Sequence, residues 1–160
     1  MAVSFLLLAC SCQSKKETMQ QIQDQLVKDS ITLNEMQTQY QDRLKADFLW
    51  CDSMLQFIPD AKVNDYFETL NLTQAYLVQF NTYYPVMMHD LAYIQQQLKN
   101  LQNDIDTHYI SDSLAMVYLS DEAASADTLH NRVLYFQDRL SSQDKTLQSL
   151  KKSIRKDASK

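Results

Sequence analysis

The most constraining feature of this 160-residue sequence is that it contains no glycine. Tight β-turns, nucleotide-binding loops and doubly wound α/β folds depend on glycine, whose missing Cβ permits positive φ angles. Only Pro59 and Pro85 interrupt a chain in which leucine, lysine, glutamine and methionine suit helix interiors. Apolar residues make up 45% of the chain, enough for a sizeable core. The sequence therefore predicts long α-helices joined by very few turns.

Apolar residues recur every three and four positions in three successive segments, the spacing of helices that pack as coiled coils. The first series is Met19, Ile22, Leu26, Leu33, Met36, Tyr40, Leu44, Phe48, Cys51, Leu55 and Ile58, and Asp29 interrupts it. The second is Val63, Tyr66, Leu70, Thr73, Leu77, Phe80, Tyr84, Met87, Leu91, Ile94, Leu98, Leu101 and Ile105. The third is Leu129, Val133, Phe136, Leu140, Gln143, Leu147, Leu150 and Ile154.

These stripes predict an all-α fold, an antiparallel up-down-up three-helix coiled-coil bundle over residues 17–157. The predicted helices are about 17–58, 61–106 and 112–156. Proline inside a helix usually kinks it, so Pro85 produces either a bend in the second helix or a reversal that makes four helices. We favour three, because the apolar register continues across the proline.

The amino terminus has the features of a targeting signal. An uncharged apolar run over residues 2–9 ends at Cys10. It is too short for a bilayer span, which takes about 20 residues, but it fits a signal-peptide core with a small residue at the cut. Leu7-Leu8-Ala9-Cys10 resembles the lipobox of bacterial lipoproteins. The resemblance implies removal of residues 1–9 and lipidation of Cys10 by diacylglycerol and a further fatty acid such as palmitate.

The residues around the lipobox extend this interpretation. Residues 10–16 form a polar tether, and Ser11 stands where some lipoproteins have the Asp that retains them in the inner membrane. The resemblance therefore implies outer-membrane anchoring, facing either the periplasm or the cell surface. The Lys or Arg that opens the family's signal is missing from residues 1–4, as in a truncated start. The alternative interpretation is the apolar beginning of a cytosolic helix.

Sequence motifs for catalysis and for cofactor or metal binding are missing. Without glycine there is no phosphate loop or dinucleotide fingerprint. His89, His108 and His130 stand far apart, and none has a metal-binding partner at helical spacing. None of the four glutamates precedes a histidine by three residues, as a di-iron bundle would need. We therefore predict no enzyme, no metal and no cofactor.

The charge is unevenly distributed. Residues 17–144 carry 19 acidic and 7 basic residues, a net charge of −12, whereas residues 145–160 carry six basic residues and one acidic residue, +5. An acidic body argues against nucleic acid as a partner. The basic end either complements the helix macrodipole or forms a docking patch.

Aromatic residues exceed what a heptad seam needs. We favour the interpretation that these residues fill a wide core and the kink at Pro85; in the alternative, Trp50, Tyr66, Phe67 and Tyr83 form a partner-binding patch and are the candidate site. The predicted function is a lipid-anchored, non-enzymatic interaction or structural module of the cell envelope. Its partners would be the membrane and either a protein or a second copy of the chain. The alternative function is binding of a small apolar ligand or lipid in a cavity near Pro85.

Overall fold

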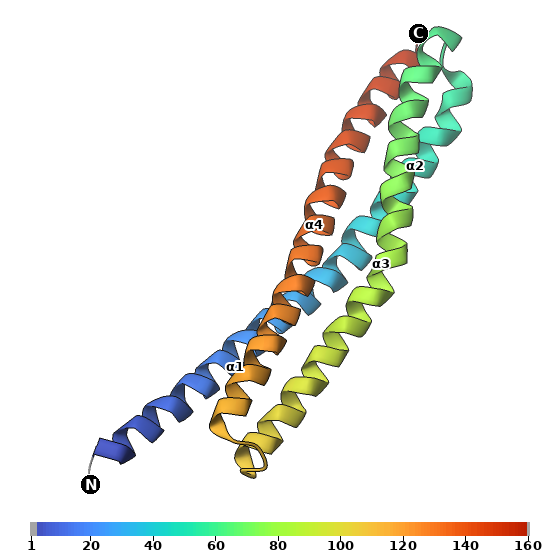
Figure 1. Ribbon diagram of the computed structural model, residues 1–160. Helices are drawn as coiled ribbons and strands as arrows, with labels where there is room; N and C mark the ends of the chain where they lie inside the picture. Colours follow the sequence, from blue (N-terminus) through green and yellow to red (C-terminus); the bar gives the residue numbers. More distant parts are fainter. Residues whose placement is uncertain (1–2, 160) are drawn as a thin grey trace. The chain divides into compact units, whose positions relative to one another are not determined.

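The computed structural model describes the backbone of residues 3–159 and the side chains of residues 15–59 and 62–159. The Cys10 side chain lies outside this described part, so lipidation stays a prediction. Within it, all regular structure is helical and no strand is present. The elements are α1 (Val3–Glu35), a π-helical turn (Met36–Gln41), α2 (Asp42–Met54), a 3-10 turn (Leu55–Phe57), α3 (Asp60–Asp106) and α4 (Asp112–Ala158) (Figure 1). The predicted all-α class is confirmed.

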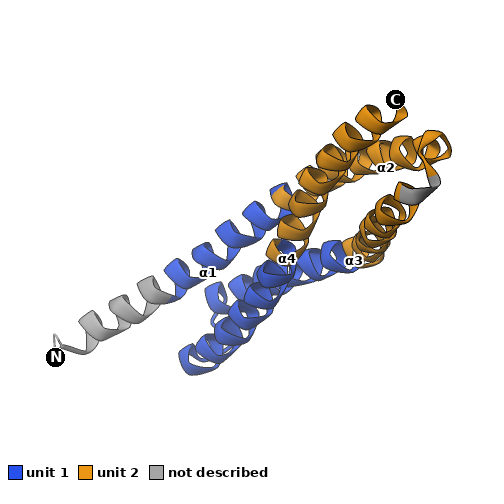
Figure 2. Cartoon of the chain, turned by 90° about the horizontal axis from the view of Figure 1, so that it is seen from above, with its two compact units in different colours: residues 1–31, 86–133 blue, residues 32–85, 134–160 orange. Residues whose placement is uncertain are grey.

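The chain divides into two compact units, each built from three helical segments (Figure 2). Unit 1 comprises Met1–Ile31 and Val86–Val133, and unit 2 comprises Thr32–Pro85 and Leu134–Lys160. All three boundaries between the units fall inside helices rather than in turns.

In unit 1, polar pairs show how the helices run. Lys15 forms an ion pair with Asp112 in the first turn of α4, and further along α1 Asp29 pairs with His130 at 2.8 Å. Because both partners advance together, α1 and α4 are parallel. The short turn at residues 107–111 makes α3 antiparallel to α4.

Unit 2 repeats this arrangement. Arg43 contacts Asp144 at 2.6 Å, and Asp47 contacts Lys151 at 2.5 Å, so α2 and α4 are parallel. A turn at Pro59 makes α3 antiparallel to α2. Each unit is therefore an up-down-up three-helix bundle, as predicted.

The two prolines have different effects on the backbone. Ile58 is extended, with φ −98° and ψ 140°, because the residue before a proline disfavours the helical region. Pro85 instead lies inside α3, which continues without a break from Asp60 to Asp106. The alternative of four helices, which required a reversal at Pro85, is therefore wrong.

The cores of both units follow the predicted heptad spacing. α4 shows it most regularly, with alternating steps of three and four between buried residues in its second half. The buried residues of α4 are Ala115, Leu119, Ala126, Leu129, Val133, Phe136, Leu140, Gln143, Leu147, Leu150, Ile154 and Asp157. Hydrophobic burial along this stripe is the main stabilising contribution of the helix.

The first stripe departs from the prediction at the π-helical turn. We expected Tyr40 and Phe48 in the core, but both are half-buried, while Gln41 and Asp47 are buried. A π-turn contains one residue more than a regular turn, so it rotates the following residues around the helix axis. The extra residue brings Gln41 into the place expected for Tyr40.

The apolar core of each unit contains a buried polar pair. In unit 2 the Thr73 hydroxyl donates to Gln143 Oε1 at 2.9 Å, and both residues are buried. In unit 1 the interrupting residue Asp29 is buried, and its Oδ1 atom lies 2.8 Å from His130 Nδ1. A buried polar group without a partner costs about 1–3 kcal/mol, so each pair disfavours other alignments of the helices.

The turn between α3 and α4 solves the problem of reversing direction without glycine. The His108 N–H bonds to the Ile105 carbonyl at 3.2 Å, and the Tyr109 N–H bonds to the Asp104 carbonyl at 2.9 Å, which together form a Schellman motif. His108 stands at the left-handed position with φ 54°, where most helices place glycine. The Ser111 hydroxyl then accepts from the Leu114 N–H and caps α4.

Replacing His108 by glycine should stabilise the protein. A side chain with a Cβ is strained at positive φ, so His108→Gly should raise the free energy of unfolding by about 1 kcal/mol. His89 on the exposed side of α3 is the matched control, because His89→Gly should lower stability by less than about 1 kcal/mol. Urea unfolding followed by circular dichroism measures both changes. A loss of stability in H108G would contradict the assignment of this turn.

Candidate functional site

The four residues predicted to bind a partner all belong to unit 2, but they do not form one patch. Trp50 on α2 and Tyr66 on α3 are half-buried, and both contact the last turns of α4. Phe67 is 50% exposed. Tyr83 is 42% exposed and packs on Phe136 with ring centroids 5.7 Å apart, which places it in a different aromatic cluster.

Trp50 is held against α4 by two cations. Lys151 Nζ lies 5.5 Å and Arg155 Cζ lies 5.2 Å from the centre of the indole ring. Cation–π contacts of this length attract the positive group to the electron-rich face of the ring. The single tryptophan of the chain therefore keeps one fixed position while part of its surface stays accessible.

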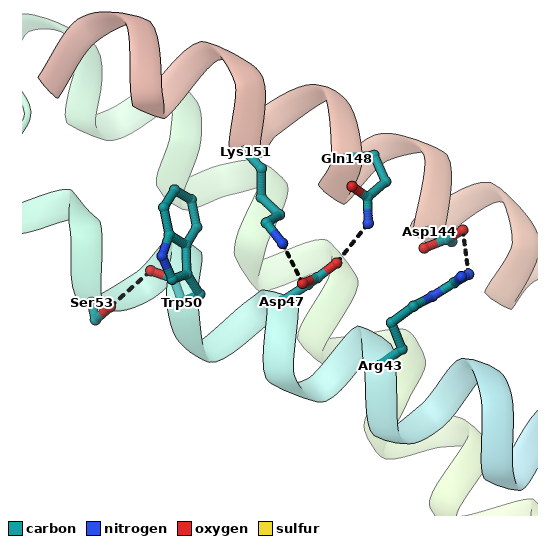
Figure 3. Close-up of polar contacts among 7 residues, drawn as sticks. All are labelled: Arg43, Asp47, Trp50, Ser53, Asp144, Gln148 and Lys151. Atoms are coloured by element: carbon teal, nitrogen blue, oxygen red, sulfur yellow. Dashed lines mark hydrogen bonds and ion pairs between the residues drawn. The ribbon is translucent and has the colours of Figure 1, made fainter. Parts of the chain in front are cut away.

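Asp47, one helical turn before Trp50, fixes the position of Lys151. The Asp47 carboxylate accepts from Lys151 Nζ at 2.5 Å and from Gln148 Nε2 at 2.6 Å (Figure 3). The residue is only 9% exposed, so this pair is screened little by water. Figure 3 shows Trp50 on the same helix as Asp47, beside the Lys151 side chain of α4.

Asp157 organises the contact between α3 and the end of α4. It accepts from Tyr66 Oη at 2.7 Å and from Lys62 Nζ at 2.8 Å. The hydrogen bond to Asp157 raises the pKa of Tyr66, and burial adds to this effect. Tyr66 therefore stays protonated and acts as a donor, which explains its orientation without a ligand.

Cys51 is buried next to Trp50 in the sequence of α2, and its thiol is free. Burial raises the pKa of the Cys51 thiol to about 11. The reactive form of cysteine is the thiolate, so this thiol is inert near neutral pH. The burial of Cys51 agrees with its place in the first apolar series, whereas the side chains of Cys10 and Cys12 lie outside the described part of the chain.

A groove of about 220 Å³ in unit 2 is lined by the end of the π-helical turn, by α2 and by the part of α3 one to three turns before Pro85. Its lining residues are Gln41, Lys45, Phe48, Leu49, Gln74, Leu77, Val78 and Asn81. The Gln41 amide nitrogen bonds to Asn81, but its buried Oε1 atom has no hydrogen-bond partner. Such an acceptor is left by the π-turn that rotates Gln41 inward.

The described histidine, cysteine and acidic residues elsewhere are dispersed. Among the described side chains, no group of three or more His, Cys, Asp and Glu residues is placed to hold a metal ion. His89 lies 3.7 Å from Asp90 but is 80% exposed. His130 is engaged by Asp29 in the core of unit 1.

Comparisons with known proteins leave the family open. No protein-family model matches the sequence, and no curated protein or solved structure is significantly similar to it. In the described part of the chain, no helix combines the length and the hydropathy needed to span a bilayer.

The sequence suggested Trp50 as a candidate, which stays a prediction, but it did not point to the residues that position Trp50. None of these residues belongs to a motif. Asp47 is more than 100 positions away in the sequence from both Gln148 and Lys151. The only usable signal was the basic composition of residues 145–160, whose contact with α2 no spacing rule predicts.

Removing the Asp47 carboxylate should loosen the site. Asp47→Ala leaves the mostly buried Lys151 ammonium unpaired, so the free energy of unfolding should fall by about 2–3 kcal/mol. Trp50 fluorescence should change at the same time, because Lys151 also contacts the indole. The exposed residue Asp42 is the control, and D42A should change neither quantity measurably. Equal effects of both variants would show that Asp47 does not fix this site.

Proposed function

We propose that this chain is a lipid-anchored, non-enzymatic interaction protein of the cell envelope. Acylation at Cys10 would hold it to the outer membrane, and unit 2 would present the binding surface around Trp50. The observation that carries the proposal is that Trp50 is only half-buried while Lys151 and Arg155 hold its ring against α4. Tryptophan and arginine dominate binding energy at protein interfaces when a rigid scaffold holds them.

The polar groups of the site favour binding over chemistry. Asp47 and Asp157 are each shared between two donors from other helices, so they hold the bundle together instead of facing a substrate. Catalysis requires groups that converge on a reacting atom. In the described part of unit 2, the buried carboxylates converge on the neighbouring helices instead.

Membrane attachment through Cys10 is supported by the amino-terminal sequence. The apolar run, the small residue Ala9 and Cys10 occur in the order that lipoprotein processing requires. Two or more acyl chains give stable membrane attachment, whereas one alone gives marginal attachment. The partner would then be recruited at the membrane surface, as a protein or a second copy of this chain.

Blocking acylation should release the protein from membranes. The full-length gene is expressed in a Gram-negative host fed with radiolabelled palmitate, and the label and the membrane fraction are measured. The wild type should be labelled and sediment with membranes, whereas Cys10→Ser should be unlabelled and unprocessed. Cys12→Ser is the matched control and should behave like the wild type. Label retained in C10S would refute Cys10 as the anchor.

A second candidate function is supported by the groove between α2 and α3. Its walls are apolar, through Phe48, Leu49, Leu77 and Val78, and Lys45 stands at its polar side. The Lys45 ammonium can pair with a carboxylate, so this arrangement fits a single-chain amphiphile such as a fatty acid. The location matches the sequence-based alternative of a ligand near Pro85.

A fluorescent fatty acid tests this second candidate. Val78, which is 58% exposed and lines the groove, is replaced by lysine, and binding of the probe is titrated. V78K should abolish saturable binding, because a charge would then lie in the acyl path. Leu72→Lys on the same helix, equally exposed but outside the groove, should bind like the wild type. Absence of saturable binding to the wild type would eliminate this candidate.

A further inference from the structure

The outer surface of the last turns of α4 is strongly basic. Lys145, Lys152 and Lys156 are separated by seven and four residues, so at 100° per residue they share one face of the helix. All three are exposed, and this face is opposite to the buried Leu147 and Ile154. Lys151 and Arg155 lie beside this row on α4 and contact the Trp50 ring. The basic surface is therefore continuous with the candidate site.

This surface contains almost no opposing charge. Between Lys145 and Ser159 the only acidic residue is Asp157, which is 8% exposed and engaged by Lys62. Among the described residues, none of the three lysines of the row has a carboxylate within ion-pair distance. The nearby exposed acids, Asp52, Asp65 and Glu68, belong to α2 and α3.

The helix macrodipole does not account for this distribution of charge. Cations stabilise a helix C-terminus only within the last turn, and α4 ends at Ala158. Lys152 lies about two turns and Lys145 almost four turns before that end. Their charges are therefore available for an external anion.

Aromatic side chains flank the basic surface. Trp50 lies against Arg155, and Phe57 in the turn after α2 is 60% exposed. This turn lies beside the end of α4, because Lys62 in the first turn of α3 is paired with Asp157. Lysine rows flanked by tryptophan and phenylalanine are typical of surfaces that sit at the lipid–water interface.

We propose that this end of unit 2 docks on an anionic phospholipid surface. Lys145, Lys152 and Lys156 contact the phosphate groups, while Trp50 and Phe57 enter the headgroup layer. The inference rests on the proposed function and goes beyond it: the surface around Trp50, proposed above to bind a protein or a second copy of the chain, here binds an anionic phospholipid membrane. Lysine is suited to a fluid array of anions, because its flexible ammonium needs no fixed bidentate geometry. The acidic residues 17–144 disfavour a nucleic acid.

Trp50 is the natural reporter for a test, because it is the only tryptophan. The full acylated protein is reconstituted into donor vesicles of phosphatidylcholine. Acceptor vesicles contain phosphatidylglycerol and brominated phosphatidylcholine, which quenches tryptophan at the interface. We expect saturable quenching of Trp50 by these acceptors, a loss of quenching at high salt, and none with acceptors of brominated phosphatidylcholine alone.

The decisive variant removes the lysine row. Each cation near an anionic membrane contributes a factor of about five to binding, so Lys145→Gln, Lys152→Gln and Lys156→Gln together should weaken it on the order of a hundredfold. The control removes three exposed lysines of unit 1, as Lys16→Gln, Lys28→Gln and Lys99→Gln. It should bind like the wild type. An equal loss in both triple variants would overturn the proposal, because binding would then follow net charge alone.

Other outcomes separate this inference from the proposed function. Protein that stays in the donor vesicles but shows no quenching by anionic acceptors would refute the inference and leave the anchor intact. Protein that leaves the donor vesicles would refute the anchor, and the same quenching comparison, made on the released full chain, would still decide the inference. Polyglutamate can be added as a competitor at the same total charge as soluble anionic lipid. If it prevents the quenching of Trp50 as strongly as that lipid does, the surface binds an acidic polypeptide and the lipid assignment is overturned.

Discussion

Each helix must bury an apolar row that recurs every three and four residues, and this works only if the rows of three helices stay aligned. Apolar contacts alone tolerate sliding, because one leucine replaces another at little cost. The buried pair of Thr73 and Gln143 does not tolerate it, since a shift of one heptad would take the Thr73 donor away from the buried Gln143 Oε1. Unit 1 uses Asp29 and His130 in the same way. Alignment in this protein is therefore a property of its few buried polar residues.

This alignment carries over to the surface. Asp47 is buried between α2 and α4 and binds Lys151, and the position of Lys151 in turn sets the cation against Trp50. An exposed tryptophan on a loop would pay conformational entropy on binding, whereas this one is ordered in advance. The same interaction thus stabilises the bundle and prepares the candidate site. A binding surface on packed helices is more exact than one on loops for this reason.

Much of the fold was predictable because heptad spacing is a local signal. The stripe of α4 from Leu129 to Ile154 is buried as expected. Even the π-turn left a trace, since Met36, Tyr40, Leu44 and Phe48 follow one another in three steps of four, one residue more than a heptad pattern allows. The predicted apolar series contained this extra residue, but it did not identify the π-helical turn. The site was less predictable, because the contact of Asp47 with Lys151 depends on tertiary pairing, and composition says nothing of which side chains meet.

The basic row of α4 is best understood by comparing positions that the fold treats alike. One and two heptads before Lys145, the same outward position carries Asp138 and Asn131, and all three residues are exposed. Packing of the bundle therefore does not require lysine at this outward position, because equivalent positions carry the acid Asp138, the amide Asn131 and the base Lys145. Residues that folding leaves free are set by solubility or by partners. Solubility is already served by the net charge of −12 over residues 17–144, and the basic end together with Lys15 and Lys16 brings the total to −5. Concentrating cations beside Trp50 thus lowers the protein's overall charge, a change that favours a specific anionic partner over general solubility.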